Sequence, residues 1–318
     1  MPDYKVVHGT KVQNISGDPP APFTGQVWYN ATTKVAKYFF VNPGSWATGG
    51  ALNTGRKMLA GAGIQTAALA TAGQDYPPAA TESYNGTAWT ELNALGTARY
   101  KLASCGTNTA ALAFGGSPGS KNETEVWNGT NWTEVNNLNT ARNYLSGCGT
   151  STAALGFGGY NSGHKNETEL WNGTNWTEVN NLTTARSGSG AAGASNTAGL
   201  VFGGTGPTTA KTETWNGTNW TEVNDLNVAK YALAGDGTST SALGFGGYNP
   251  SAFTTQTESY NGTNWTELAD LSIARYGLGG AGANNTSALA FGGSGSPTNL
   301  TATEEWNKGP TTATLGSE

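Results

Sequence analysis

The chain has 318 residues, of which 47 are glycine, and it carries only 16 basic and 21 acidic side chains. Strong helix formers such as Lys, Glu and Arg are scarce while Gly, Thr and Asn are abundant, so the composition excludes a helical bundle or a doubly wound α/β enzyme and favours turns and sheets. The net charge of −5 without a basic cluster argues against nucleic-acid binding, and no apolar run is long enough to span a membrane.

The first 43 residues precede any repeat. They contain no basic segment followed by an apolar stretch, so we expect no secretory signal peptide. We interpret residues 1–43 as an N-terminal extension that attaches the protein to a larger assembly. Residues 44–48 (GSWAT) match the last strand of a unit that recurs later in the chain, but here this strand stands alone.

Residues 44–307 contain six copies of one unit. A segment of the type W/Y-N-G-T-x-W-T-E begins at Tyr84, Trp127, Trp171, Trp215 and Tyr260, and a truncated copy begins at Trp306. The copies recur about every 44 residues, a period typical of repeat architectures such as propellers.

Each copy predicts four short strands. A small-residue strand follows a basic residue, and a short polar turn leads to a hydrophobic strand that usually ends in two glycines. A variable loop then leads to a T-E-x-aromatic strand, and an N-G turn leads to a strand that starts with Trp. The N-G pair predicts a tight hairpin with positive φ at both turn centres. Four strands per copy at this period predict the blades of a β-propeller.

We therefore predict an all-β fold, a six-bladed β-propeller of four-stranded antiparallel blades over residues 44–307. The last copy lacks its fourth strand, whereas a lone strand at about Ser45–Thr48 precedes the first copy. We expect this N-terminal strand to complete the last blade and close the ring, because closure leaves no open blade. We interpret residues 308–318 as a C-terminal tail.

The order of hydrophobic run, double glycine, Glu-x-aromatic, Trp and small-Arg resembles the kelch repeat over about four fifths of the chain. This resemblance implies a propeller fold but no particular activity, because propellers host many functions. The near-identity of the copies and the GQVWYN segment of the extension also resemble structural proteins of phage virions that carry kelch-like propellers.

Two charged positions recur in register. The basic residues are Arg56, Arg99, Arg142, Arg186, Lys230 and Arg275, and the glutamates are Glu82, Glu125, Glu169, Glu213, Glu258 and Glu304. Matching numbers in matching register predict ion pairs within or between blades, because a buried arginine normally has a carboxylate partner. The alternative is a basic ring at the channel mouth that binds an anion.

One tryptophan also recurs per copy. The set is Trp46, Trp89, Trp132, Trp176, Trp220 and Trp265. Their fixed register predicts packing between neighbouring blades, with a sugar-stacking ladder as the alternative.

Cys105 and Cys148 occupy equivalent positions in adjacent copies, where three others have Ala. We interpret both as free, small, buried thiols. Asp236 occupies the same position and is a candidate to hold a water or a cation.

The loops after the double glycines vary in sequence and in length, from seven to nine residues, whereas the turns at the other end of the blades hardly change. Loops on a rigid scaffold usually carry binding specificity. We therefore expect a ligand or partner to bind this rim. The candidate contact residues are Tyr76, Lys121, Tyr160, His164, Tyr248 and Phe253. The alternative is drift in loops that nothing constrains.

The sequence offers no catalytic constellation. His8 and His164 are the two histidines and cannot build a His-rich metal centre, and the glycine pairs lack a phosphate-loop context. We therefore expect no enzyme, no cofactor and no metal.

The leading interpretation is a phage virion structural or adhesion module. Its extension would bind other virion proteins, and its loop rim would meet a host-surface glycan or protein. The alternative is a free-standing carbohydrate-binding, lectin-like propeller. We expect neither nucleic acid nor membrane as a partner, and we expect the protein to be located in the virion.

Overall fold

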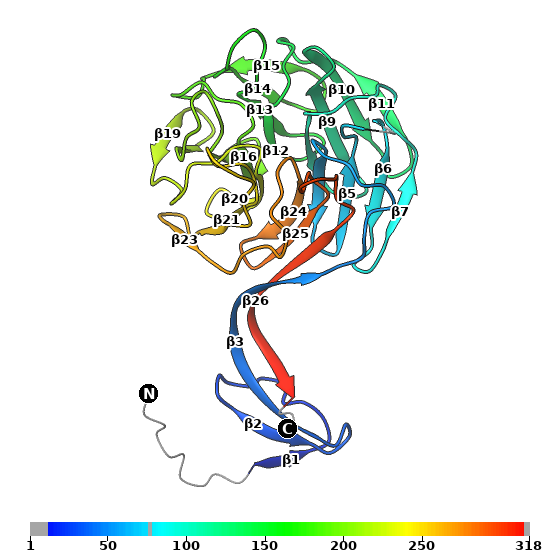
Figure 1. The fold of residues 1–318 in the computed structure, drawn as a ribbon, viewed down its shortest axis with the longest axis vertical. Helices are drawn as coiled ribbons and strands as arrows, with labels where there is room; N and C mark the ends of the chain where they lie inside the picture. The colour runs from blue at the N-terminus through cyan, green and yellow to red at the C-terminus, as the bar shows by residue number, and fades with distance from the viewer. Residues whose placement is uncertain (1–11, 76–77, 315–318) are drawn as a thin grey trace. The chain divides into compact units, whose positions relative to one another are not determined.

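The computed structural model describes residues 12–75 and 78–314. Every secondary-structure element in these ranges is a β-strand (Figure 1). The chain divides into two compact units: residues 45–307 form one, and the chain before residue 45 with the chain after residue 307 forms the other. Within the described ranges, no helix meets the length and apolarity that a membrane crossing requires.

The larger unit is a ring of six four-stranded blades, which confirms the predicted all-β, six-bladed propeller. Blade 1 consists of β4 (Ala60–Ile64), β5 (Ala67–Thr71), β6 (Thr81–Tyr84) and β7 (Trp89–Leu92). Blade 2 consists of β8 (Ala103–Gly106), β9 (Ala111–Gly116), β10 (Lys121–Trp127) and β11 (Trp132–Val135). Blade 3 consists of β12 (Ser146–Gly149), β13 (Ala154–Phe157), β14 (Thr168–Trp171) and β15 (Trp176–Val179).

The next two blades repeat this pattern. Blade 4 consists of β16 (Gly190–Ser195), β17 (Ala198–Phe202), β18 (Thr212–Trp215) and β19 (Trp220–Val223). Blade 5 consists of β20 (Ala234–Thr238), β21 (Ser241–Phe245), β22 (Thr257–Tyr260) and β23 (Trp265–Glu267). The first strands contact one another in a closed circle from β4 through β8, β12, β16, β20 and β24 back to β4, so they surround a central channel (Figure 1).

Blade 6 takes strands from both ends of the chain. The strands β24 (Gly279–Asn284), β25 (Ser287–Phe291), β26 (Thr303–Thr314) and β3 (Val35–Thr48) lie in that order in one sheet. The predicted closing strand at Ser45–Thr48 is thus the end of the longer β3.

The larger unit ends at residue 307, and the chain after it belongs to the smaller unit. Residues 308–314, interpreted from the sequence as part of a tail, continue β26 as strand. The physical reason is that three of these residues are β-branched threonines, which favour extended backbone, and that β3 pairs with β26.

The hairpins between third and fourth strands are wider than predicted. In blade 2, Trp127 pairs with Trp132, so four residues form the loop. Asn128 Oδ1 accepts the backbone N–H groups two and three positions later, at 2.9 and 2.8 Å, and only Gly129 in this loop has a positive φ, 92°. The prediction of positive φ at both residues of the N-G pair is wrong, because the asparagine side chain forms an Asx turn and the glycine alone enters the left-handed region.

The double glycines bring neighbouring blades together. In five blades the second glycine, and in blade 1 Gly73 after Ala72, donates its N–H to the carbonyl of the basic residue just before the next blade, as Gly116 does to Arg142 at 2.8 Å. Gly116 has φ 118°, and a Cβ added to Gly115 would lie 2.8 Å from the same carbonyl oxygen. The pair therefore allows a backbone approach that larger residues would block.

The smaller unit is organised around Asp18. Its strand β1 (Gln13–Ile15) runs parallel to β2 (Val27–Asn30), which forms an antiparallel hairpin with β3. The Asp18 carboxylate accepts hydrogen bonds from Lys37 Nζ at 2.8 Å, Asn30 Nδ2 at 2.8 Å and Trp28 Nε1 at 3.1 Å. These bonds, that from Lys37 foremost, lower the pKa of Asp18.

Removal of the N-terminal strand tests how the ring closes. Deleting residues 1–49 removes the outer strand of blade 6 with Trp46, whose ring lies 5.4 Å from that of Trp306. We expect this deletion to abolish cooperative unfolding of the propeller. It leaves β26 without its neighbouring strand and blade 5 without the contact to Trp46. Deleting residues 1–25 retains Trp46 and should preserve the transition. Scanning calorimetry measures both, and a cooperative transition in the longer deletion would show that the ring does not need β3.

Candidate functional site

The two ends of the propeller are built from different segments. The loop face comprises the connections from second to third strands together with the residues just before the first strands. β-Bridges such as Tyr100 with Ser117 and Tyr231 with Tyr248 hold these two sets of segments together. The turn face, at the other end, comprises the connections from first to second and from third to fourth strands.

A closed ring of six backbone hydrogen bonds surrounds the channel mouth on the loop face. Each member donates its N–H to the carbonyl of the member in the preceding blade, at 2.6–2.9 Å, and each has φ between 50° and 61°. The members are Met58, Lys101, Tyr144, Gly188, Ala232 and Gly277. A non-glycine residue in the left-handed region costs about 1–2 kcal/mol, so the ring holds Lys101 and Tyr144 in a backbone conformation that they would not adopt alone.

Three cavities follow the channel behind this ring. The first, of about 90 Å³, is lined by the ring members and by the residues that follow them, mostly leucine. The second, of about 110 Å³, is lined by the next residues of the first strands, and the third, of about 340 Å³, lies at the turn-face end. The cavity nearest the mouth thus has the smallest volume and is lined by larger side chains than the turn-face end, where most lining residues are glycine or alanine.

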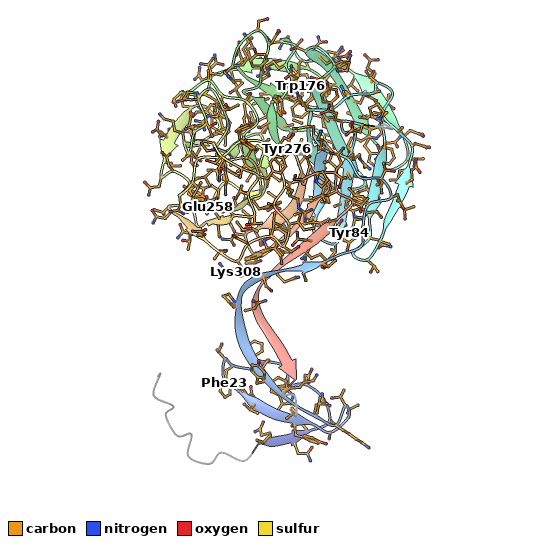
Figure 2. All side chains as sticks on the ribbon, viewed as in Figure 1. Phe23, Tyr84, Trp176, Glu258, Tyr276 and Lys308 are labelled. Atoms are coloured by element: carbon orange, nitrogen blue, oxygen red, sulfur yellow. The ribbon has the colours of Figure 1, made fainter. Side chains whose placement is uncertain are left out.

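Four half-buried aromatic side chains cluster beside the mouth on blades 5 and 6. The ring centroids of Tyr231 and Tyr248 are 5.4 Å apart, those of Tyr248 and Phe253 5.7 Å, and those of Phe253 and Tyr276 4.7 Å. Figure 2 shows Tyr276 near the middle of the ring of blades. The cluster brings the predicted contact residues Tyr248 and Phe253 together with Tyr231 and Tyr276, which lie just before first strands.

The other predicted contact residues are more dispersed. Tyr160 is 41% exposed and its ring meets that of His164 edge-on at 5.4 Å, while His164 Nδ1 shares a hydrogen bond of 3.1 Å with Ser187 Oγ. Lys121 forms an ion pair of 3.2 Å with Glu123. Tyr76 lies outside the described residues.

The recurring basic residues are buried inside their blades and each pairs with the recurring glutamate of the same blade. The pairs are Arg56–Glu82, Arg99–Glu125, Arg142–Glu169, Arg186–Glu213, Lys230–Glu258 and Arg275–Glu304. Arg142 is 2.8 Å from Glu169 and also donates to two backbone carbonyls, and Glu169 accepts the N–H of Asn139 at 2.7 Å. The expected ion pairs are present, and these cations do not form a basic ring at the mouth.

The recurring tryptophans join neighbouring blades. Each donates its indole N–H to a threonine hydroxyl of the preceding blade, at 2.9–3.0 Å. The pairs are Trp46–Thr257, Trp89–Thr303, Trp132–Thr81, Trp176–Thr124, Trp220–Thr168 and Trp265–Thr212. The ring of Trp176 also packs on Phe114 at 4.8 Å. The predicted packing between blades is observed, so these rings do not form a sugar-stacking ladder.

The buried channel wall contains two thiols and one acid. Cys105 and Cys148 are free, and burial raises the pKa of Cys148 to about 12. Asp236 is 6% exposed, lines the 340 Å³ cavity, and neither of its carboxylate oxygens has a hydrogen-bond partner within the described residues. Burial raises the pKa of Asp236 well above 3.8. In residues 12–75 and 78–314, no three His, Cys, Asp or Glu side chains are grouped so that they could hold a metal ion.

Comparison with known proteins supports the fold. The chain is similar to the solved structure of YjhT, with a TM-score of 0.68 and 14% sequence identity over 80% of this chain and 95% of that one. No family model and no curated protein matches the chain. At this identity the likeness concerns the propeller fold alone.

Sequence reasoning missed the residues that line the mouth. The third residue after the recurring basic residue is leucine in five copies and Ser189 in the fourth, and the two positions between differ from copy to copy: KM, YK, NY, SG, YA and YG. These positions include Tyr100, Lys101, Tyr144, Tyr231 and Tyr276. The sequence signal for these residues is variation between two nearly constant neighbours.

The buried ion pair generates one prediction. Replacing Arg142 by Met leaves the charge of Glu169 buried without its partner, which should lower the free energy of unfolding by about 3–5 kcal/mol. Adding Glu169→Gln should recover part of this loss. As a control, Lys211→Met removes an exposed pair with Glu222 and should cost less than about 1 kcal/mol. Urea titration measures all three, and equal stability of the single and double variants would contradict the coupling.

Asp236 generates a second prediction. Folded Asp236 keeps its proton at pH values where the unfolded chain, with a pKa near 3.8, has lost it. Asp236 therefore contributes most to the stability of the folded state below pH 3.8. This contribution falls as the pH rises towards the higher pKa of the folded state. Asp236→Ala, which installs the residue of blades 1, 4 and 6, should raise Tm more at pH 8 than at pH 3.5. An equal shift at both pH values would contradict this account, and Ala281→Asp should show the opposite effect.

Proposed function

We propose that the chain is a non-enzymatic binding scaffold of the kelch-repeat type, acting as a structural or adhesion module of a phage virion. In this proposal the loop face binds a host-surface glycan or protein, and the N-terminal unit binds other virion proteins. The observation that carries the proposal is the contrast between the two ends of the propeller. One end is uniform and uses its polar groups internally, whereas the other differs from blade to blade.

The turn face has little left to bind with. None of the residues in its turns, such as 107–110 and 128–131, is charged. The exposed amide of Asn93 donates to the carbonyl of Thr130 at 3.0 Å and to Asn131 Oδ1 at 2.9 Å in the next blade. Equivalent asparagines in blades 2 and 3 repeat both bonds. These groups stabilise the ring, which accounts for their repetition.

The loop face has the features of a recognition surface. Half-exposed aromatic rings at Tyr231, Tyr248, Phe253 and Tyr276 form one patch that no other pair of blades repeats within the described residues. Aromatic side chains supply contact area at low entropic cost and are enriched where proteins bind partners. Because the patch lies on a rigid scaffold, a partner would bind without reordering the backbone.

The N-terminal unit supports the attachment role. Its hairpin alternates, with Trp28 fully buried while Val27 and Tyr29 are 39% and 36% exposed, and Phe23, labelled in Figure 2, is 69% exposed. Exposed apolar side chains gathered in a small unit are typical of protein–protein contact. The GQVWYN segment that resembles phage structural proteins lies in this hairpin.

A free-standing carbohydrate-binding propeller is the second candidate. The aromatic patch favours it, because flat rings suit the apolar faces of sugars. Mass spectrometry of purified particles separates the two: a chain present in particles supports the virion module, and a chain found only outside them supports the lectin-like alternative.

Cell binding tests the role of the loop face. We expect labelled protein to bind intact bacterial cells or a glycan array, and Tyr248→Ala with Phe253→Ala to weaken that binding at least tenfold, because both rings belong to the patch. The matched control changes Thr109, Thr152 and Thr197, exposed on the turn face, to Ala and should bind like the parent. Equal binding by both variants, with both folded by calorimetry, would contradict the proposal.

A further inference from the structure

Lys101 occupies a fixed and unusual place at the channel mouth. Its N–H donates to the carbonyl of Met58 at 2.9 Å, and its own carbonyl accepts the N–H of Tyr144 at 2.8 Å. With φ at 57°, its backbone is locked in the hydrogen-bonded ring. The side chain therefore leaves the ring from a defined point beside the cavity of about 90 Å³.

The Lys101 ammonium lies among aromatic rings and forms no ion pair in the part of the chain that the structure describes. Its Nζ lies 4.3 Å from the ring centroid of Tyr144 and 5.4 Å from that of Tyr100. By contrast, Lys121, Lys165 and Lys211 on the same face all pair with glutamates. Partial burial lowers the pKa of Lys101.

The side chains around this ammonium include two tyrosines, whose hydroxyls can donate a hydrogen bond to an anion. Burial, followed by the charges of the phenols of Tyr276, Tyr231 and Tyr100, raises the pKa of Tyr144. The Tyr144 hydroxyl donates only to Met58 Sδ, at 3.3 Å, which is a weak acceptor. The ring carbonyls already accept ring hydrogen bonds, so the strong acceptors at the mouth are occupied.

The mouth also lacks acidic competitors. Lys101 is the one charged residue that lines the cavity within the described ranges, and the residues behind it are mostly buried leucines such as Leu102 and Leu145. An apolar wall lowers the local dielectric and strengthens the attraction of an ammonium for an anion. In the described part of the blade 1 loop, the acid Asp75 accepts a hydrogen bond from Asn299.

We propose that the channel mouth binds the carboxylate of an acidic saccharide, such as a uronic acid residue, with Lys101 pairing with the carboxylate and the tyrosine hydroxyls donating to it. This inference rests on the proposed function and specifies the ligand class of the loop face. A saccharide fits better than an acidic peptide, because the same loop face also carries the aromatic patch at Tyr248, Phe253 and Tyr276, and flat rings suit the apolar faces of sugars.

The chain supplies its own matched variant. Blade 1 has Met58 at the position equivalent to Lys101, with φ 55° against 57°. Lys101→Met should therefore fold in the same backbone ring while removing the charge. Lys211→Met removes a paired lysine from the rim of the same face and serves as control. Tyr144→Phe removes one hydroxyl and keeps the ring.

Calorimetric titration of the full chain with tetragalacturonate, neutral maltotetraose and a capped tetraglutamate peptide tests the proposal. We expect tetragalacturonate to bind at least tenfold more tightly than maltotetraose, and to bind more weakly at 0.5 M salt. The affinity for tetragalacturonate should fall at least tenfold in Lys101→Met and severalfold in Tyr144→Phe. In Lys211→Met it should change less than twofold. Absence of uronate binding, or equal affinity in Lys101→Met, would overturn the proposal.

The remaining outcomes are also decisive. Tighter binding of the peptide than of the uronate would overturn the choice of a saccharide. If the Tyr248 and Phe253 changes abolish cell binding while Lys101→Met binds cells and uronate like the parent, the loop-face function stands and this inference fails. Uronate binding through Lys101 without any cell binding would support the site and contradict the adhesion role.

Discussion

The indole hydrogen bond from each outer strand to a threonine of the preceding blade is the contact on which the ring depends. A four-stranded blade cannot cover both of its faces alone, so each must be covered by a neighbour. The six Trp–Thr bonds join each blade to the preceding one around the ring. One of them is donated by Trp46, which lies at the N-terminal end of the propeller, to blade 5. The buried Arg–Glu pairs then fix the linker between blades, as Glu169 does by accepting the N–H of Asn139.

Because the ring is closed by other contacts, the sequence of the loop face can differ from blade to blade. The backbone at the mouth is held by its own circle of hydrogen bonds, and four of its six members are strained non-glycine residues. Strain of this kind persists only where the surroundings enforce it, and it concentrates at functional sites. Lys101 and Tyr144 are therefore presented by a rigid frame, and the variable loops surround them.

The repeat made most of the fold predictable, because the positions of Arg142, Glu169, Trp176 and the double glycines carry direct physical constraints. Burial of a charge requires a partner, and a large ring at fixed register requires a neighbour to pack against. The site was less predictable. Lys101 and Tyr144 come together only because the ring brings blades 2 and 3 into register, and no local pattern shows that their φ is positive. The strand at residues 308–314 depends likewise on pairing with β3, distant in sequence.

Hydrogen–deuterium exchange of the protein, free and bound to its target cells or glycan, tests most directly whether the two ends have different roles. The account predicts slower exchange on binding in segments 100–102, 143–145 and 248–256 of the loop face, and unchanged exchange in the turn-face segments 107–110 and 128–131. Protection confined to the turn-face segments would contradict the account.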